Sequence, residues 1–496
     1  MRTVYTAKRL EDVGRALVQH RELERHDAWN FGQIQDLQRE RLNRLLRHAV
    51  ASSPFYRDLY GQTVPKDGVH MEDLPVVTKA MVMENFARVV TDPRLRLAQL
   101  RRHVEGLTTD ALYLGRYRVF ATSGHTGVPG IFVFDRREWT TALASALRSM
   151  SLTGNRPRLP RRVRMAAVAA PSPIHVTHRI SESLDVGLYR KLDASVTTPV
   201  AELARALDAF QPDVLVTYPS IAAELAREQL EGRLRIRPRT VTTGAELLTE
   251  DMRDVIREAW AVEPFNLYGI TEAGGVFACE CSRHLGLHAF EDLVLFEVVD
   301  ERNRPVPRGA TGRKVLLTNL FGYTQPLIRY EVTDMVAVVD GPCPCGRPLR
   351  LLRVAEGRSD DLLHLPSRHA GTVPVHPIAL HGPLMKVAGV KQYQIVHDGR
   401  GINVKVVPAT GGSPDATRAA LQRALRESLE SIGIVPPPIS VEVVTAIERE
   451  GQAAKLKLVR SLDARERAPS LSRAINSRVP QDPSEPRSMH AGEREA

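Results

Sequence analysis

Residues 213–230 read DVLVTYPSIAAELAREQL, in which a short apolar run is followed by a polar turn and then by a helical pattern. The same order of elements recurs from about residue 118 onward, for example from VRMAAVAA at 163–170 to VAELARALDAF at 200–210. Strands that alternate with helices of about ten to fifteen residues indicate a parallel sheet with crossover helices. The sequence therefore predicts a large α/β domain with parallel sheets.

Polar loops follow four of the predicted strands. They are ATSGHTG at 121–127, TYPS at 217–220, TTGAE at 242–246 and YGITE at 268–272. Ligands of open α/β sheets bind outside the carboxyl ends of the strands. We therefore expect these loops to meet at one ligand site.

The loop at 121–127 is rich in glycine, serine and threonine. Backbone N–H groups of such a loop can cradle phosphates, and glycine lets the ligand approach closely. No GK[ST] follows the loop, and neither GxGxxG nor GxSxG occurs in the chain, so Walker A, dinucleotide and nucleophile-elbow motifs are not indicated. A plain turn of small residues is the alternative interpretation.

Charged residues on other predicted loops could complete a nucleotide site. Glu272 shares the loop of Tyr268 and could hold Mg²⁺ against phosphate oxygens. Asp334 follows a predicted strand, where its carboxylate suits a grip on ribose hydroxyls. Arg358 lies near a change in sequence texture, and Lys455 lies in the C-terminal part.

The composition is that of an ordinary globular protein, and 496 residues allow about three structural units. The net charge is +10 and the pI is near 9.6, but basic residues are scattered and not interleaved with aromatic residues. No apolar run reaches the ~18 residues of a membrane span, and the N-terminus lacks a signal-peptide core. We expect a cytoplasmic protein with no nucleic-acid or membrane partner.

The C-terminal part has its own pattern of elements. A hairpin is predicted at 390–408, an amphipathic helix at 415–434 and a strand at 439–447, which together indicate a small α+β unit. The last residues are rich in proline, serine and charge, as in a disordered tail. We expect a large N-terminal domain at 1–359, a smaller domain at 360–464 joined by a hinge, and a tail at 465–496.

The four cysteines occur in two close pairs, CEC at 279–281 and CPC at 343–345. In a reducing compartment this spacing favours a metal over disulfides. Cys281, His288, Cys343 and Cys345 are our preferred tetrahedral Zn²⁺ ligands, with Cys279 and His284 as competitors. Buried free thiols are the alternative.

Together, these motifs resemble the adenylate-forming superfamily and, within it, the phenylacetate–CoA ligase and coenzyme F390 synthetase-like group. The resemblance covers about residues 30–462. Its further motifs are RLLRHAVASSPFYRDLYG at 44–61, LPVVTKAMVMENF at 74–86, QPLIRYEVTD at 325–334, CPCGRP at 343–348 and GRSDDLL at 357–363.

The resemblance implies a role for each residue that matches a family motif. Ser123, Gly124, His125, Thr126 and Gly127 would surround the ATP phosphates, and Gly244, Ala245, Glu246 and Tyr268 would lie near the adenine. Thr271 would contact the α-phosphate, Glu272 the Mg²⁺, and Asp334 with Arg358 the ribose. Asp360 would be the hinge and Lys455 the lysine that bridges acid and phosphate, with Lys457 as its rival. Pro171, His175, Tyr218 and Gly269 would line the acid pocket.

Two residues of the phosphate loop depart from the family pattern SSGTTGKP. His125 replaces a threonine, and Val128 replaces the loop lysine. We expect the loss of this lysine to weaken the grip on departing pyrophosphate, with His125 either a partial substitute or merely tolerated.

The implied activity is ATP-dependent activation of a carboxylic acid as acyl-AMP, with release of pyrophosphate and transfer to the thiol of CoA. The ring of Tyr218 and the imidazoles of His175 and His178 favour a small aryl or heteroaryl acid, although a core role for the tyrosine and exposed histidines are alternatives. An adenylating ligase that transfers the acyl group to an amine, a hydroxyl or a carrier protein is a second hypothesis. A noncatalytic nucleotide-binding protein is a third. The oligomeric state stays open, with a homodimer as one option.

Overall fold

The computed structural model describes most of the 496-residue chain. The described residues are 2–61, 71–122, 130–156, 162–169, 173, 175–196, 198–358, 363–368, 372–375, 380, 384, 387, 390–398, 400–408, 414–431, 433–447 and 459–461. No helix of these segments is long and apolar enough to span a membrane.

Helices form the N-terminal part and pack around a two-stranded hairpin. The sequence sets their boundaries: Asn30 accepts a hydrogen bond from the Gln33 amide before α2, and Pro54 begins α3. The helices are α1 (Arg2–His26), α2 (Phe31–Ser52), α3 (Pro54–Tyr60), η1 (Met71–Asp73), α4 (Lys79–Glu84), α5 (Phe86–Val89) and α6 (Leu97–Glu105).

The hairpin differs from the predicted parallel arrangement. Strand β1 (Arg118–Thr122) pairs antiparallel with β2 (Gly130–Phe134), so the small-residue loop joins two strands of a hairpin. The prediction that β1 belongs to a parallel sheet was wrong. A parallel crossover needs about a dozen residues or more, and the buried run GIFVF at 130–134 forms a strand that supplies the antiparallel partner.

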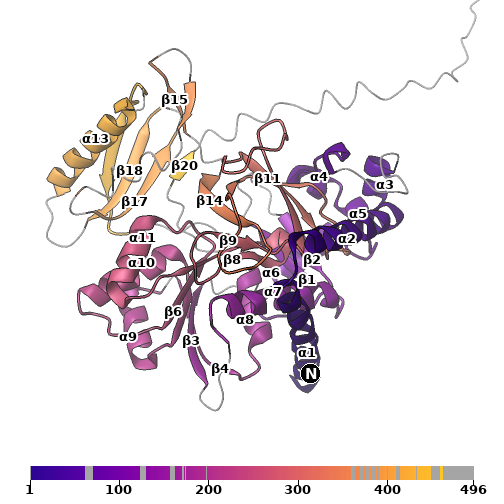
Figure 1. Ribbon diagram of the computed structural model, residues 1–496. Helices are drawn as coiled ribbons and strands as arrows, with labels where there is room; N and C mark the ends of the chain where they lie inside the picture. The colour runs from indigo at the N-terminus through magenta and orange to yellow at the C-terminus, as the bar shows by residue number, and fades with distance from the viewer. Residues whose placement is uncertain are drawn as a thin grey trace, which may run out of the picture.

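A nine-stranded mixed sheet is the centre of the large domain (Figure 1). Its order is β13-β14-β9-β8-β7-β6-β5-β3-β4, and neighbours from β7 to β4 are parallel. The predicted α/β class is therefore confirmed, with antiparallel strands added at one side. The strands are β3 (Val163–Ala169), β4 (Tyr189–Ser195), β5 (Val214–Thr217), β6 (Thr240–Gly244), β7 (Phe265–Ile270), β8 (Gly275–Glu280), β9 (Leu287–Ala289), β13 (Asp334–Val338) and β14 (Leu351–Arg358).

Helices accompany this sheet as the alternating pattern predicted. The aliphatic side chains of β3, β5 and β6 pack with those of α9 to α11 in one buried cluster. The helices are α7 (Arg136–Leu152), α8 (Val176–Leu184), α9 (Val200–Phe210), α10 (Pro219–Leu230) and α11 (Glu250–Trp260).

A three-stranded antiparallel sheet adjoins the antiparallel side of the large sheet. It consists of β10 (Val294–Val299), β11 (Lys314–Asn319) and β12 (Tyr330–Val332). Its apolar side chains share a buried cluster with Phe277 of β8 and Val336 of β13. Strand β13 of the large sheet follows β12 almost directly in the sequence, so the chain returns from this sheet to the large one.

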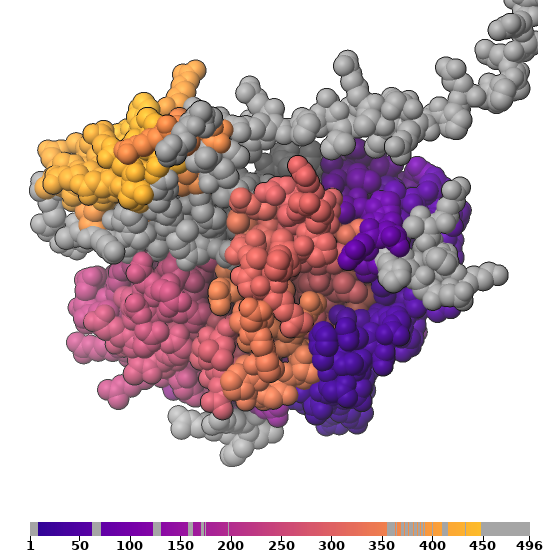
Figure 2. All heavy atoms as spheres, turned by 45° about the horizontal axis from the view of Figure 1, so that its top comes forward, coloured from indigo at the N-terminus to yellow at the C-terminus, as the bar shows by residue number. Residues whose placement is uncertain are grey.

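The C-terminal residues form an α+β unit with its own core (Figure 1). The predicted hairpin, helix and following strand are present, and the sheet order is β19-β18-β17-β20. In the space-filling view this unit is a lobe of its own, beside the segment that carries α9 to α11 (Figure 2). Its elements are β15 (Leu363–Pro366), β16 (Thr372–Val375), β17 (Val390–His397), β18 (Ile402–Pro408), α13 (Pro414–Ser431), β19 (Ile439–Val443) and β20 (Val459–Ser461).

Candidate nucleotide-binding site

The loops after β5, β6 and β7 lie at the same edge of the large sheet. Strands β6 and β7 are parallel neighbours with Gly244 opposite Leu267, and a Cβ on Gly244 would lie 3.1 Å from the Leu267 carbonyl oxygen. Ala245 then takes a left-handed conformation with φ of 69°. The Glu246 carboxylate accepts a hydrogen bond of 3.3 Å from the Ser220 amide at the start of α10, so two of the predicted loops are joined directly.

The turn between β7 and β8 carries Thr271 and Glu272. A Cβ on Gly269 would lie 2.7 Å from the Gly275 carbonyl oxygen, so only glycine fits where the two strands meet. The turn η2 (Thr271–Ala273) ends at Gly274, which has φ of 73°. Glu272 is therefore held on a tight reversal rather than on a long loop.

Asp334 lies beside this turn at the start of β13. Its Oδ2 atom accepts a hydrogen bond of 2.6 Å from the Tyr268 hydroxyl, and only 8% of Asp334 is exposed. The Tyr268 ring packs edge-on against Phe277 at 4.6 Å between centroids. The strand register places Arg358 of β14 directly opposite Asp334. The structure thus brings together backbone positions that lie far apart in the sequence.

Glu272 is contacted by two residues of the small sheet. Asn319 Nδ2 donates to the Glu272 main-chain oxygen at 3.3 Å, and the Tyr330 phenol lies near enough to Glu272 to feel its charge. Burial, and then the charge of Glu272, raise the pKa of Tyr330 far above its ordinary value. The phenol therefore stays protonated. The carboxylate oxygens suit a hard cation, because Mg²⁺ is commonly bound by one or two carboxylates together with substrate phosphates.

Lys79 stands between the two ends of the phosphate-loop hairpin. Its Nζ atom lies 3.2 Å from the Thr122 hydroxyl oxygen, and a Cβ on Gly130 would lie 2.8 Å from its Cε atom. Thr78 caps α4 and so fixes where Lys79 begins the helix. Sequence reasoning missed this lysine, although the valine at position 128 was a signal that a cation could come from elsewhere.

Several predicted residues lie outside the described residues, although the strands that flank them are described. They are Ser123, Gly124, His125, Thr126, Gly127, Val128, Pro171, Asp360, Lys455 and Lys457, and of Arg358 only the backbone is described. Strand β1, which enters the loop, contacts the turn of Glu272. The roles of these residues stay predictions.

The predicted acid pocket is described in part. Tyr218 is 4% exposed and belongs to the core cluster of α9 to α11, which supports its alternative core role. His175 precedes α8 and is half-buried, and His178 faces Glu182 at 3.9 Å. Helix α8 adjoins the site turn, since a Cβ on Gly275 would lie 2.8 Å from Ile180 Cδ1.

The four preferred metal ligands lie close together, two in the segment of β8 and β9 and two in the turn between β13 and β14. The ligand atoms of Cys281, His288, Cys343 and Cys345 all lie within 4.8 Å of one another. The Cys281 and Cys343 sulfurs are 3.8 Å apart, and the Cys345 sulfur lies 3.3 Å from His288 Nε2. Zinc–sulfur bonds of about 2.3 Å in a tetrahedron would place two sulfurs about 3.8 Å apart, so the donor set fits this ion.

The competing ligands point elsewhere. Cys279 is fully buried with its sulfur 3.1 Å from the Glu280 carbonyl oxygen. His284 Nδ1 lies 3.2 Å from Glu280 Oε2, and its ring packs on Phe265. The preferred choice of four residues therefore agrees with the geometry.

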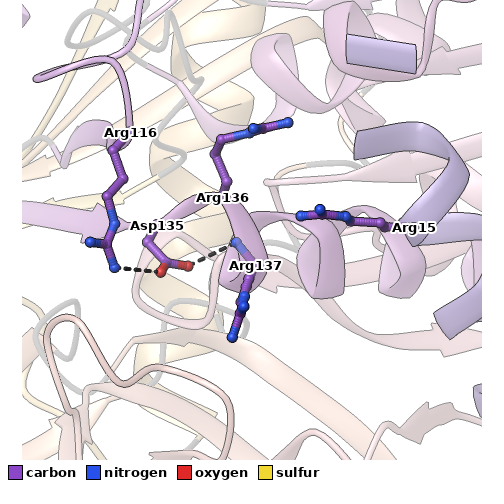
Figure 3. A pocket seen from close by; sticks show the side chains of 5 residues that line it. All are labelled: Arg15, Arg116, Asp135, Arg136 and Arg137. Carbon is purple, nitrogen blue, oxygen red and sulfur yellow. Dashed lines mark hydrogen bonds and ion pairs between the residues drawn. The ribbon is translucent and has the colours of Figure 1, made fainter. Parts of the chain in front are cut away.

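A hollow of about 450 Å³ lies at the N-terminus of α7, at the end of β2 away from the phosphate loop (Figure 3). It is lined by Arg15, Arg116, Asp135, Arg136 and Arg137. Acidic groups balance much of its charge: Arg116 pairs with Asp135 at 3.2 Å, and Glu11 pairs with both Arg15 and Arg136. Because it lies at the far end of β2 from the phosphate loop, the hollow is separate from the candidate nucleotide site.

Several known proteins with similar sequences or folds are CoA ligases. The chain is 27% identical over 372 residues to the phenylacetate-coenzyme A ligase of Thermus thermophilus, which covers 73% of this chain and 78% of the relative. It is 24% identical over 487 residues to the Escherichia coli phenylacetate-coenzyme A ligase, which covers 90% and 99%. The structure of 2-hydroxyisobutyryl-CoA ligase with R3-HIB-AMP matches with a TM-score of 0.69 and 21% identity over 92% of this chain and 94% of the other. No family model matches the chain.

The fold is shared with 2-hydroxyisobutyryl-CoA ligase over most of both chains. The sequence resembles the phenylacetate–CoA ligases over most of its length, which confirms the family resemblance predicted from the motifs.

Proposed function

We propose that the protein activates a carboxylic acid with ATP as acyl-AMP and then transfers the acyl group to CoA. The observation that carries the proposal is twofold: the loops of Gly244 to Glu246 and of Glu272 follow neighbouring parallel strands, and the Tyr268 hydroxyl joins Asp334 to the second of these strands. These residues match the nucleotide-binding motifs of the family, and the similarity to phenylacetate–CoA ligases supports the same two-step reaction.

The chemistry follows from the charges at this site. A carboxylate oxygen attacks the α-phosphorus of ATP, the bond to the β-phosphate oxygen breaks, and pyrophosphate leaves. Mg²⁺ bound by Glu272 would offset the repulsion between the two anions. Asp334 would hold the ribose, and Lys455 would bridge the acid and the α-phosphate, so that positioning and electrostatics supply the catalysis. The CoA thiolate then attacks the acyl carbonyl, and AMP leaves.

We propose a small aryl or heteroaryl acid as the substrate. The curated relatives act on phenylacetate by their names, and His175 and His178 lie at the start of α8, next to the site turn. An amine, a hydroxyl or a carrier protein as acceptor is the second candidate, because no CoA-specific motif occurs in the sequence.

We further propose that Cys281, His288, Cys343 and Cys345 bind one structural zinc. The four donors fill a tetrahedral shell, so they leave no position for substrate. The ion would join the β8–β9 segment to the turn between β13 and β14. Strand β8 begins just after the turn that carries Glu272, and β13 begins at Asp334, so the ion would stabilise the site without taking part in the reaction.

ATP-dependent pyrophosphate release, measured with a panel of aryl and aliphatic acids with and without CoA, tests the proposal. Release with an aryl acid and a product of acyl-CoA mass is expected. Release that ends at acyl-AMP despite CoA would favour the second acceptor class. ATP binding without release for any acid would contradict the proposed reaction and favour a noncatalytic nucleotide-binding protein.

A further inference from the structure

Helix α8 has a charged residue in its buried stripe. Its buried side chains are Val176, Arg179, Ile180 and Ser183, which follow the spacing of one helix face. Val176 and Ile180 are ordinary core residues, whereas Arg179 is 0% exposed although it carries a charge. Burial of a charge costs much free energy unless the charge is paired and hydrogen-bonded. The partners of Arg179 therefore determine where this helix can lie.

The Arg179 guanidinium joins α8 to the segment that leads into the phosphate loop. Its Nε atom donates to the Asp110 carboxylate, Nη1 donates to the Val119 carbonyl oxygen of β1 at 3.1 Å, and Nη2 donates to the Ala111 carbonyl oxygen at 2.8 Å. Its Cζ atom also lies 5.1 Å from the centre of the Phe120 ring. A guanidinium holds its donors in a rigid planar fork, so these acceptors fix the position of α8 against β1.

The apolar part of the same stripe packs against the turn that carries Thr271 and Glu272. A Cβ on Gly275 would lie 2.8 Å from Ile180 Cδ1 and 3.6 Å from Val176 Cγ2. Gly275 is the first residue of β8 and follows this turn closely in the sequence. Helix α8 thus lies between the strand that enters the phosphate loop and the turn of Glu272, and a shift of α8 would be felt by both.

The C-terminal end of α8 is held by α1 and α7. Arg9 of α1 donates through Nε to the Ser183 carbonyl oxygen at 3.3 Å and through Nη2 to the Asp185 carbonyl oxygen. The Trp139 indole N–H of α7 donates to the Ser183 hydroxyl at 3.1 Å. The last carbonyl groups of a helix have no partner within the helix, and a cation near them is favourable. Arg9 therefore stabilises the end of α8 from outside the helix.

We propose that Arg179 and Arg9 are positioning residues for the acid substrate, because they fix α8 as one wall of the acid pocket. The inference rests on the proposed function, in which the acid lies near His175 at the start of α8 and the ATP phosphates lie at the end of β1. Adenylation needs reacting atoms about 3–3.5 Å apart, and a misplacement of about 1 Å can cost about a hundredfold in rate. A helix bonded to β1 keeps the acid aligned with the phosphate loop.

A role of Arg179 in stability alone is separated from this proposal by a matched control. Arg148 of α7 is likewise 0% exposed, and its Nη1 atom lies 2.8 Å from Asp292 Oδ1. Its second acidic partner is Asp27, and neither partner lies on α8 or β1. Replacement of either arginine by lysine keeps the charge but removes the planar fork. Both variants should lose stability, but only Arg179→Lys should affect the acid.

The experiment measures the binding of the acyl group without turnover. Calorimetry on the full-length chain gives the Kd of 5′-O-sulfamoyladenosine and of its N-benzoyl and N-phenylacetyl derivatives, which are stable analogues of acyl-AMP. The Kd of the parent compound divided by the Kd of the derivative that the wild type prefers is the acyl gain. Thermal unfolding shows whether each variant is folded.

The expected result is a loss of acyl gain without a loss of nucleotide binding. Arg179→Lys should lower the acyl gain about tenfold, because hydrogen bonds from a charged donor have effects of this size, and should leave the Kd of 5′-O-sulfamoyladenosine unchanged. Arg9→Gln should lower the acyl gain in the same direction but by less, since Arg9 is only half-buried. Arg148→Lys should keep the acyl gain of the wild type.

An acyl gain that is unchanged in both Arg179→Lys and Arg9→Gln, or that falls equally in Arg148→Lys, would overturn the inference. If Arg179→Lys does not fold, Arg9→Gln decides, because this side chain reaches α8 from α1 and is not part of the buried stripe. A wild-type chain that binds none of the three compounds, or that gains nothing from either acyl group, would instead contradict the proposed function.

Discussion

The Lys79 ammonium nitrogen lies 3.2 Å from the hydroxyl oxygen of Thr122, the last residue of β1 before the phosphate loop. The same side chain adjoins Gly130, the first residue after the loop. One lysine side chain thus lies near both ends of the phosphate loop. In the family pattern the loop itself carries a lysine, and Val128 stands at that position here.

We predict that Lys79 supplies part of the missing positive charge. Lys79→Met should lower kcat/KM for pyrophosphate release about tenfold to a hundredfold, because a hydrogen bond to a charged group contributes about 1.5–3 kcal/mol. Val128→Lys in the same variant should restore part of the loss. Steady-state kinetics on the four proteins of this cycle measure both effects. Unchanged kcat/KM in Lys79→Met would show that the ammonium does not reach the phosphates.

Lys455 is predicted to be the lysine of the adenylation step. Lys455→Ala should slow pyrophosphate release by about a hundredfold or more, because removal of a preorganised group that stabilises transition-state charge has effects of this size. Transfer from added acyl-AMP to CoA should change little. Lys457→Ala is the control, and the reverse order of effects would assign the role to Lys457.

The zinc site predicts a metal content of about one ion per chain. Cys345→Ser should lower the zinc content measured by mass spectrometry and the unfolding temperature, since ligand loss removes binding energy from the folded state. Cys279→Ala is the control, because this sulfur lies outside the four-ligand group. Equal zinc loss in the control, or zinc-free wild-type protein with full thermal stability, would contradict the site.

We predict that the buried carboxylate of Asp292 makes the free energy of unfolding fall at acidic pH. Burial alone would raise its pKa, but the Arg148 charge and the His26 hydrogen bond lower the pKa to about 2 from an ordinary value of 3.8. A lowered pKa in the folded state gives stability that is present above about pH 4 and is lost as the pH falls toward 2. The contribution is about 2 kcal/mol at neutral pH.

Urea unfolding between pH 2 and pH 6 measures this dependence of the free energy of unfolding on pH. Asp292→Asn should be less stable above pH 4, where it leaves Arg148 buried with part of its charge unpaired. The difference from wild type should shrink as the pH falls. A constant difference over this range would mean that Asp292 does not titrate in the folded state as expected.

The site could be predicted from sequence where local patterns determine it. The strand–turn–helix repeat was sufficient to place the loops of Gly244 and Glu272 at one sheet edge, because parallel strands put their carboxyl ends together. Likewise, the two close pairs of cysteines in the sequence indicated a metal site. The structure shows which cysteine of the first pair belongs to the cluster, namely Cys281 and not Cys279.

Local sequence patterns could not predict contacts between segments that are distant in the sequence. The strand at 130–134 was missed because a short apolar run has no period of its own. The antiparallel hairpin was missed for the same reason, since this strand is one of its two members. The approach of Tyr330 to Glu272 and the contact of Lys79 with Thr122 join segments whose spacing in sequence carries no information on their distance in space.

The most direct test of the central claim follows the carboxylate oxygen. An aryl acid that is accepted in pyrophosphate release is labelled with ¹⁸O in both carboxylate positions and incubated with ATP, Mg²⁺, CoA and the protein. If the acid attacks the α-phosphorus, its oxygen becomes the bridge of acyl-AMP and leaves with AMP when the thiol attacks. The account predicts AMP that carries one ¹⁸O atom and pyrophosphate that carries none. Unlabelled AMP, or label in a phosphate split from the γ-position, would contradict adenylation as the reaction of this protein.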